Sequence, residues 1–146
     1  GLTYYLDEKG NKVLGLHEIN GDLYYFRRGG AYKYTQLGDM WQDSINYIDG
    51  KIYYFGHDGR AIKNRFYQWG NYWYYFYADG SAATGAVQIN GQQLYFDKNH
   101  GRQVKGAFAP DGHYYDENSG ELVTNQTRTI KGVTYHFDEN GNATKV

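Results

Sequence analysis

The chain has 146 residues, a formal net charge of −1 and no cysteine, which excludes disulfides and thiolate metal sites and leaves no electrostatic footprint for nucleic acid. Tyrosine dominates the apolar fraction, with 18 Tyr and 7 Phe against a single Met. Because tyrosine packs like an apolar residue but keeps a hydroxyl that needs water or a partner, we expect much half-buried surface and little deep interior.

The chain is a series of repeats of about 20 residues, each with an aromatic segment. In chain order the copies are GLTYYLD from Gly1, INGDLYYF from Ile19, IDGKIYYF from Ile48, WGNYWYYF from Trp69, INGQQLYF from Ile89, PDGHYYD from Pro110 and IKGVTYHF from Ile130. Their glycines lie 20 or 21 residues apart, except for the 29 residues between Gly21 and Gly50. Such self-similarity is the sequence signature of a repeat architecture.

Turn signals bracket every aromatic segment. Asn-Gly or Asp-Gly between two extended runs is the strongest short hairpin signal, and it occurs at Asn20-Gly21, Asp49-Gly50, Asn90-Gly91 and Asp111-Gly112. A second glycine closes each copy, at positions 10, 30, 59, 80, 101, 120 and 141. Each copy therefore reads as strand, tight turn, aromatic strand, second turn and short return.

A lone hairpin is marginal in water, so each copy needs its neighbours. The predicted fold is all-β, an elongated solenoid of about seven consecutive β-hairpin repeats of roughly 20 residues, forming a single domain over residues 1–146. An irregular insertion at about 31–44 interrupts the period. It is either a lengthened return loop or a degenerate extra hairpin, and Tyr32, Tyr34 and Trp41 give it apolar side chains to pack.

These residues carry a family resemblance. AVQINGQQLYFD from Ala86 and QVKGAFAPDGHYYDENSGEL from Gln103 resemble the cell-wall-binding repeats of Gram-positive bacteria, and within them the glucan-binding domain of glucansucrases. The resemblance implies a repeat domain beside a catalytic region that builds α-glucan from sucrose, with shallow pockets for dextran-type chains between successive hairpins. We therefore expect a non-catalytic module that binds α-glucan polysaccharide or isomalto-oligosaccharides without a cofactor.

The same resemblance implies a monomeric fragment of a larger secreted protein, extracellular or associated with the cell surface. No apolar run approaches the roughly 18 residues that span a bilayer, so no membrane insertion is expected. The sequence does not distinguish α-1,6 from α-1,3 linkage, nor does it give the number of working pockets.

Sugar pockets need an aromatic floor for the apolar face of glucose and polar side chains for its hydroxyls. The family's pocket, carried onto this chain, predicts a first site from Tyr74, Tyr75, Gln88, Tyr95, Gln103 and Lys105. A second predicted site comprises Tyr53, Tyr54, Lys63, Gln68 and Trp73. Against this stands a purely structural interpretation, in which at least one aromatic of each copy packs between hairpins and Gln103 and Lys105 are solvated strand residues.

Other functions remain open. Choline-binding repeats are similar, but of their aromatic signature only Trp73-Tyr74-Tyr75 is present. Receptor-binding repeats of clostridial toxins are similar too, with occasional units of about 30 residues. A choline or cell-wall anchor predicts that choline protects the fold, whereas a structural spacer predicts that no saccharide binds.

No enzyme or metal site is predicted. Most of the 16 acidic residues stand in glycine-containing turns such as DEKGN, GHDGR, YADGS and DENGN, where a turn role explains them. The five histidines show no metal-type spacing with carboxylates, and neither a nucleophile elbow nor a phosphate-binding glycine loop occurs.

Overall fold

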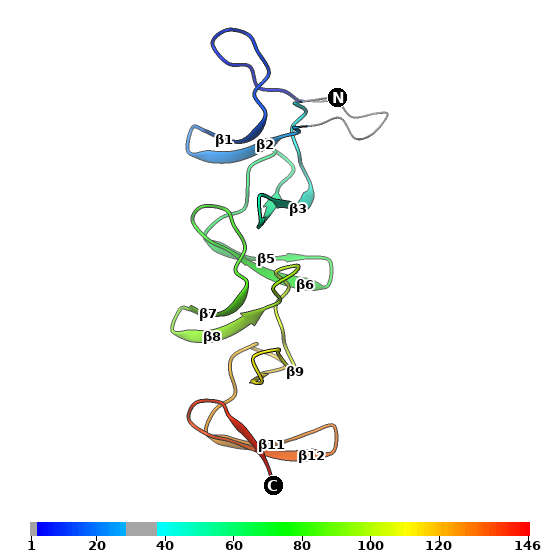
Figure 1. Ribbon diagram of the computed structural model, residues 1–146, viewed down its shortest axis with the longest axis vertical. Helices are drawn as coiled ribbons and strands as arrows, with labels where there is room; N and C mark the ends of the chain where they lie inside the picture. The colour runs from blue at the N-terminus through cyan, green and yellow to red at the C-terminus, as the bar shows by residue number, and fades with distance from the viewer. Residues whose placement is uncertain (1–2, 29–37) are drawn as a thin grey trace. The chain divides into compact units, whose positions relative to one another are not determined.

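The computed structural model describes residues 3–28 and 38–146 and is built of β-strands and turns (Figure 1). The strands are β1 (Gly15–Ile19), β2 (Asp22–Phe26), β3 (Ser44–Ile48), β4 (Lys51–Phe55), β5 (Arg65–Trp69), β6 (Tyr72–Phe76), β7 (Gly85–Ile89), β8 (Gln92–Phe96), β9 (Ala107–Phe108), β10 (Tyr114–Tyr115), β11 (Gln126–Ile130), β12 (Val133–Phe137) and β13 (Ala143–Lys145). Within this described part, no helix is long and apolar enough to cross a membrane.

Neighbouring strands pair into consecutive antiparallel hairpins. The pairs are β1–β2, β3–β4, β5–β6, β7–β8 and β9–β10, and β13 adds to β11–β12. The residues that flank each tight turn face one another, as in Ile48↔Lys51 and Ile89↔Gln92. The opening copy makes the isolated bridge Leu6↔Lys12. The predicted all-β series of hairpins is confirmed.

The tight turns obtain their shape from residues with positive φ. Asn20 and Gly21 have φ of 54° and 85°, and Asp49 and Gly50 have 50° and 82°. Two consecutive positive values define the type I′ turn, whose twist matches that of the flanking strands. The β9–β10 hairpin departs from this pattern, because Ala109 N donates to His113 O across a longer loop that contains Pro110.

Return segments join each hairpin to the one before it. The last aromatic residue of a hairpin bridges to a residue of its own return segment, as in Phe55↔Ala61, Phe76↔Ala82 and Phe96↔Gln103. The N–H of that return residue also donates to the aromatic strand of the preceding hairpin. These inter-hairpin bonds are Ala61 N to Leu23 O (2.8 Å), Ala82 N to Ile52 O (2.8 Å), Gln103 N to Trp73 O (2.8 Å) and Leu122 N to Gln93 O (2.9 Å).

The insertion begins at the return turn of the β1–β2 hairpin. Arg27 N donates to Asp39 O (2.9 Å), which is the position of the bond from Gly56 N to Arg60 O in the next repeat. Phe26 bridges to Met40, whose N–H donates to Thr3 O. The extra residues therefore lie between Arg28 and Gly38. The predicted closing glycine at 30 and the tyrosines at 32 and 34 lie outside the described residues, and Gly38, with φ of 87°, takes the closing conformation.

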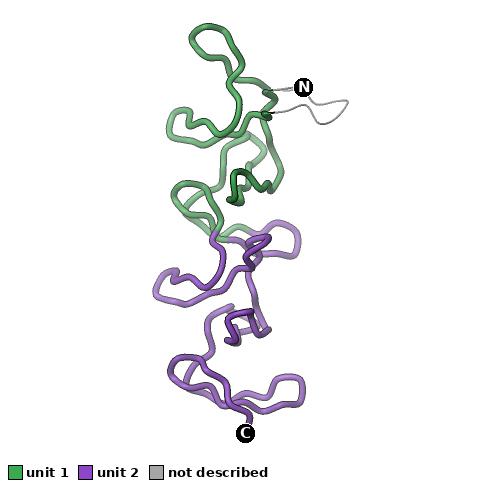
Figure 2. The backbone as a smooth tube through the Cα atoms, viewed as in Figure 1, with its two compact units in different colours: residues 1–67, 75–82 green, residues 68–74, 83–146 purple. Residues whose placement is uncertain are grey.

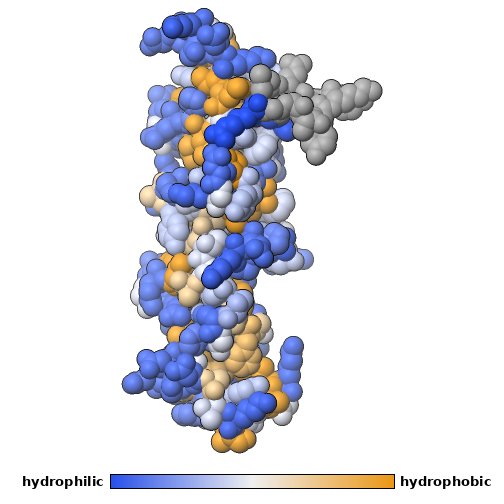
Figure 3. All heavy atoms as spheres, viewed as in Figure 1, coloured by the Kyte–Doolittle hydropathy of each residue, from blue (hydrophilic) through white to orange (hydrophobic). Residues whose placement is uncertain are grey.

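The chain divides into two compact units (Figure 2), unit 1 with residues 1–67 and 75–82 and unit 2 with residues 68–74 and 83–146. Aromatic residues form the core of each. In unit 1, Tyr25, Tyr53 and Phe55 cluster with Ile48 and Ala61. In unit 2, one cluster holds Tyr95, Ala109 and Tyr115, and another holds Tyr114, Val123 and Phe137. On the face shown in Figure 3, apolar residues reach the surface in separate patches between hydrophilic ones.

Two glycines of one hairpin test how much the inter-hairpin contact contributes to stability. Gly141 and Gly132 have φ of 83° and 82°, but a Cβ at Gly141 would lie 2.8 Å from Leu122 Cδ1 and 3.1 Å from His113 Nδ1. A Cβ at Gly132 meets no described atom within 4 Å. Both Gly→Ala changes carry the left-handed backbone cost of about 1–2 kcal/mol. We expect Gly141→Ala to lower the free energy of unfolding by about 1–3 kcal/mol more than Gly132→Ala does, because the added methyl group overpacks this contact. Urea unfolding of both variants measures the difference. Equal losses would contradict close packing at the return turn.

Candidate functional site

The predicted pocket tyrosines are largely core residues. Tyr53, Tyr54, Tyr74 and Tyr95 are all buried, with Tyr74 and Tyr95 only 1% and 2% exposed. The Tyr95 ring centre lies 5.7 Å from that of Tyr115, and the Tyr54 ring centre lies 4.6 Å from that of Tyr67. Burial, and then the hydrogen bond with Tyr67, raises the pKa of Tyr54 to about 12. A ligand therefore has access to little of these rings.

Two of the predicted residues nevertheless line one cavity in unit 1. This cavity of about 300 Å³, called here the Tyr53 cavity, includes Tyr53 from the β3–β4 hairpin and Lys63 from the segment before β5. Its remaining lining residues are Leu16, Glu18, Gly21, Leu23, Ala78 and Asp79. The cavity therefore has an apolar side from the β1–β2 hairpin and a polar side of both charges.

Hydrogen bonds fix the polar side of the Tyr53 cavity. Lys63 Nζ donates to Gly21 O (2.6 Å) and lies 3.9 Å from Asp22 Oδ1. Asp79 accepts from the Ser81 hydroxyl (2.6 Å) and backbone N–H (2.9 Å), and these bonds lower the pKa of its carboxyl. Burial, followed by the charges of Asp79 and Asp49, raises the pKa of the Tyr53 phenol. At neutral pH the cavity thus offers an ionised acceptor and a protonated hydroxyl, a combination suited to a ligand rich in hydroxyl groups.

A second cavity of unit 1 is aromatic. Its volume is about 530 Å³, and we call it the Tyr24 cavity. It is lined by Thr3, Tyr4, Tyr5, Ile19, Tyr24, Phe26, Met40, Gln42, His57 and Asp58. Lys12 Nζ already lies 4.0 Å from the Tyr4 ring centre, a cation–π distance. The Asp58 carboxylate adds a negative charge, and hydrogen bonds from Arg60, from its backbone N–H first, lower its pKa.

A third cavity of unit 1 is mainly charged. Its volume is about 550 Å³, and its lining includes Asp22, His57, Asp58, Arg60 and Lys63. Arg60 pairs with Asp58 (2.6 Å) and reaches Asp22 (3.7 Å), so its guanidinium is already engaged by carboxylates.

Unit 2 holds an exposed aromatic group. Trp69, Tyr72 and Trp73, from the β5–β6 hairpin, are between 37% and 44% exposed. Three residues of one return segment lie against it, namely Arg102, Gln103 and Lys105. The Arg102 guanidinium carbon lies 4.0 Å from the Tyr72 ring centre, and Lys105 Nζ lies 5.6 Å from the Trp73 ring. We call these six residues the unit 2 aromatic cluster. Trp73, predicted for the second pocket, here contacts Gln103 and Lys105 of the first.

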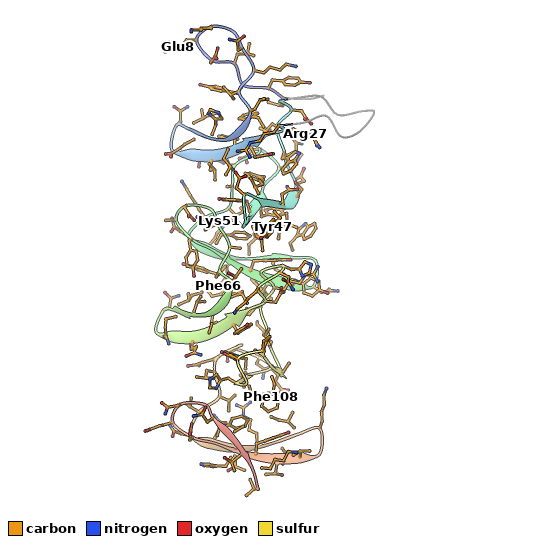
Figure 4. The ribbon with its side chains drawn as sticks, in the orientation of Figure 1. Glu8, Arg27, Tyr47, Lys51, Phe66 and Phe108 are labelled. Atoms are coloured by element: carbon orange, nitrogen blue, oxygen red, sulfur yellow. The ribbon has the colours of Figure 1, made fainter. Side chains whose placement is uncertain are left out.

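The other predicted residues lie outside these groups. Tyr75 is half-buried in unit 1, edge-on to Phe66 (4.9 Å) and Tyr77 (5.7 Å); Figure 4 labels Phe66 on β5. Gln88 is exposed on β7 opposite Gln93, and Gln68 is exposed on β5. Their roles in binding stay predictions.

Sequence reasoning missed several residues of these sites. Tyr72 and Trp69 flank the tip of their hairpin, and Arg102 precedes Lys105 by three residues in the same return segment. A count of aromatic side chains at turn tips would have found the first two. Glu18 and Asp79 carried no usable signal, because their positions read as ordinary strand and turn acids. Among the residues described, no group of three His, Asp or Glu is placed to hold a metal ion.

Comparison with known proteins identifies the repeats. The choline-binding repeat family matches residues 83–126, and the putative cell wall binding repeat family matches residues 64–82 and 128–143. The chain belongs to the cell-wall-binding and choline-binding repeats. These matched segments together cover β5 to β12, the part of the chain where the inter-hairpin bonds from Ala82, Gln103 and Leu122 also occur.

Relatives of these repeats occur within much longer proteins. The chain is 39% identical over 149 residues to glucosyltransferase-S of Streptococcus mutans and 37% identical over 150 residues to glucosyltransferase-I of Streptococcus downei. Each match covers 98% of the chain but only 10% and 9% of the relative. Choline binding protein F of Streptococcus pneumoniae, whose structure was solved with a peptidoglycan analogue, is 29% identical with a TM-score of 0.75, covering 97% of this chain and 43% of that one. The hairpin series thus matches the fold of a choline-binding repeat protein.

A pair of substitutions separates core from exposed tyrosines within unit 2. We expect Tyr95→Ala to lower the free energy of unfolding by about 3–5 kcal/mol, because it removes a buried ring from the cluster with Tyr115. Tyr72→Ala removes an exposed ring and should cost less than about 1 kcal/mol. Both are measured by denaturant unfolding followed by circular dichroism. Similar losses for the two variants would place the Tyr72 ring in the core.

Proposed function

We propose that this chain is a non-catalytic repeat module that binds α-glucan chains of the dextran type. The observation that carries the proposal is the Tyr53 cavity, where an aromatic residue and a lysine named from sequence alone line one space with two carboxylates. Its volume of about 300 Å³ stands at the lower end of the roughly 300–1,000 Å³ usual for small-ligand sites. One or two sugar rings suit such a space better than a large ligand.

The chemistry of the cavity supports a neutral sugar. Lys63 lies 3.9 Å from Asp22 and Asp79 lies 3.6 Å from Lys51, so both of these lining charges already have a partner of opposite sign within the protein. Asp79 and Glu18 supply acceptors for sugar hydroxyls, and Tyr53 supplies a hydroxyl that has no partner among the residues the structure describes. The apolar side chains of Leu16 and Leu23 would face the C–H surface of the sugar ring.

Each site of this kind is weak. A few hydrogen bonds of roughly 0.5–1.5 kcal/mol must offset the ordering of a flexible sugar, so we expect dissociation constants from tens of micromolar to millimolar. A second weak contact on the same polymer raises the apparent affinity through effective concentration. The exposed rings of the unit 2 aromatic cluster offer such a contact. Repetition of weak sites therefore favours a polymer as the ligand.

The parent protein is part of the proposal. We infer that the module belongs to an extracellular glucosyltransferase or cell-surface protein of a Gram-positive bacterium and holds it on glucan. The support is the match over 98% of the chain to two streptococcal glucosyltransferases, of which the chain spans about a tenth.

Affinity electrophoresis through dextran tests the cavity. We expect dextran to retard the chain, and Tyr53→Phe and Lys63→Gln to weaken binding by about 2- to 10-fold, since each removes about one hydrogen bond. Lys9→Gln is the matched control, because it removes the same charge from an exposed turn of unit 1 and should bind normally. Unchanged mobility of the parent chain over a wide range of dextran would refute glucan binding.

A second candidate function is binding of a quaternary ammonium group such as choline. The Tyr24 cavity favours it, because aromatic rings and a carboxylate surround a space large enough for such a cation. The likeness to choline binding protein F supports it at 29% identity. This site is separate from the Tyr53 cavity in its lining residues, so the two functions are compatible.

Choline titration distinguishes the second candidate. If the Tyr24 cavity takes the cation, millimolar choline should raise the melting temperature, and Tyr24→Ala and Asp58→Asn should abolish the shift. Tyr47→Ala serves as the control, since Tyr47 on β3 is 66% exposed (Figure 4) and does not line the cavity. A melting temperature independent of choline would leave glucan binding as the function.

A further inference from the structure

The unit 2 aromatic cluster carries two cations, Arg102 and Lys105. Arg102 and Lys105 form no ion pair or side-chain hydrogen bond with any residue that the structure describes. The Arg102 Nε is buried and has no acceptor within residues 3–28 and 38–146. By contrast, Arg60 and Lys63 in the cavities of unit 1 are each engaged by carboxylates.

The backbone holds both cations at the exposed rings. Gln103 N donates to Trp73 O, which fixes the return segment against β6. Arg102 then lies over Tyr72 at 4.0 Å and Lys105 over Trp73 at 5.6 Å. The Gln103 and Lys105 side chains are held from the other direction by the backbone at Gly120, where an added Cβ would contact Gln103 Nε2 and lie 3.3 Å from Lys105 Cγ. The positions of the two charges are therefore set by packing rather than by an acid.

Asp97 is the acidic residue nearest to Arg102 in the sequence, and its carboxylate already accepts hydrogen bonds within its own turn. Asp97 accepts from the backbone N–H groups of Asn99 (2.9 Å), His100 (2.6 Å) and Arg102 (3.1 Å). Its oxygens point to the backbone of residues 99–102 and do not pair with the Arg102 guanidinium. The Arg102 guanidinium therefore has no acidic partner within its own turn.

We propose that the unit 2 aromatic cluster binds an anionic group on a glycan, either a carboxylate or a phosphate. Arg102 supplies a planar fork that matches two oxygens of either group, and Lys105 supplies a second charge. The exposed faces of Tyr72 and Trp73 take the sugar ring beside the anion. A neutral glucan would leave both cations unpaired, whereas a charged glycan satisfies them. The inference does not require glucan in the Tyr53 cavity.

Three forms of one polymer test the proposal, namely neutral dextran, carboxymethyl-dextran and phosphorylated dextran. The full chain should bind one or both charged forms at least about fivefold more tightly than neutral dextran at low ionic strength, with the preference falling as salt rises. The charged form that binds more tightly identifies the group. Equal affinity for all three polymers would overturn the proposal.

Charge-matched variants distinguish a specific anion-binding site from non-specific electrostatic attraction. The double variant Arg102→Gln/Lys105→Gln should lose the preference for charged dextran, so that it binds the three polymers with equal affinity. Lys98→Gln/Lys145→Gln removes two exposed charges from the same unit and should keep the preference. Equal losses in both double variants would show non-specific attraction and refute the site. Arg102→Lys, checked for folding by circular dichroism, keeps the charge but loses the fork, and it should weaken the preference at least about twofold.

If the first double variant abolishes binding to neutral dextran as well, the cluster is a neutral glucan site and the proposed anion preference is wrong. Loss of neutral dextran binding on Lys63→Gln alone concerns the Tyr53 cavity and leaves the anion site standing. The two proposals therefore fail in different measurements.

Discussion

One backbone hydrogen bond per repeat holds each return segment to the hairpin before it. A two-stranded hairpin of five-residue strands buries too little to be stable in water. The bond from Ala82 N to Ile52 O, and its equivalents in the other repeats, place the return segment where the last aromatic of its own hairpin closes over it. The residue at this position varies from Ala61 to Leu122 while the bond keeps its length, because it is made by the backbone. Each hairpin therefore depends on the adjacent hairpins both to hold its strands and to bury its aromatic side chains.

The same arrangement determines where ligands have access. An aromatic strand that receives a return segment has its last ring buried, as with Phe55, Phe76 and Phe96. In β6 the side chains nearer the tight turn, Tyr72 and Trp73, stay at the surface. The Tyr53 cavity forms where the lysine after one return segment reaches the turn of the preceding hairpin, since Lys63 Nζ bonds to Gly21 O. The cavity proposed here to bind sugar therefore belongs to a pair of repeats rather than to a single one.

The hairpins could be predicted from the sequence because the residues within each turn determine its conformation. Asn-Gly and Asp-Gly pairs adopt the required positive φ, and the spacing of the copies reports the repeat directly. A third set of positive-φ residues was missed, at Gly15, Asp43, Asn64, Gly85, Gly106 and Asn125. Glycine, Asn or Asp recurs there in every repeat, so the signal was present but lay outside the aromatic motif.

The site was harder to predict, because the two faces of a twisted strand cannot be assigned without its neighbours. Tyr74 and Trp73 are adjacent in sequence, yet one is buried and the other exposed. The motif alone favours the tyrosines, whereas packing leaves the tryptophan accessible. Lys63 lines a cavity with Tyr53 and Lys105 lies near the Trp73 ring, and their roles in binding stay predictions. The acids and the arginine beside them come from positions with no distinctive pattern.

The hydrogen bonds on either side of the insertion show that a return turn tolerates a change in length. Arg27 N bonds to Asp39 O across twelve residues, whereas Gly56 N bonds to Arg60 O across four, and both close the same return turn. A strand that gained an odd number of residues would exchange its buried and exposed faces. The return turn has no such restriction, since pairing resumes at Met40 in the register of the other repeats. The regular pairing of the hairpins does not require a constant number of residues in the return turns. Residues can therefore be added at a return turn without altering the hairpins on either side.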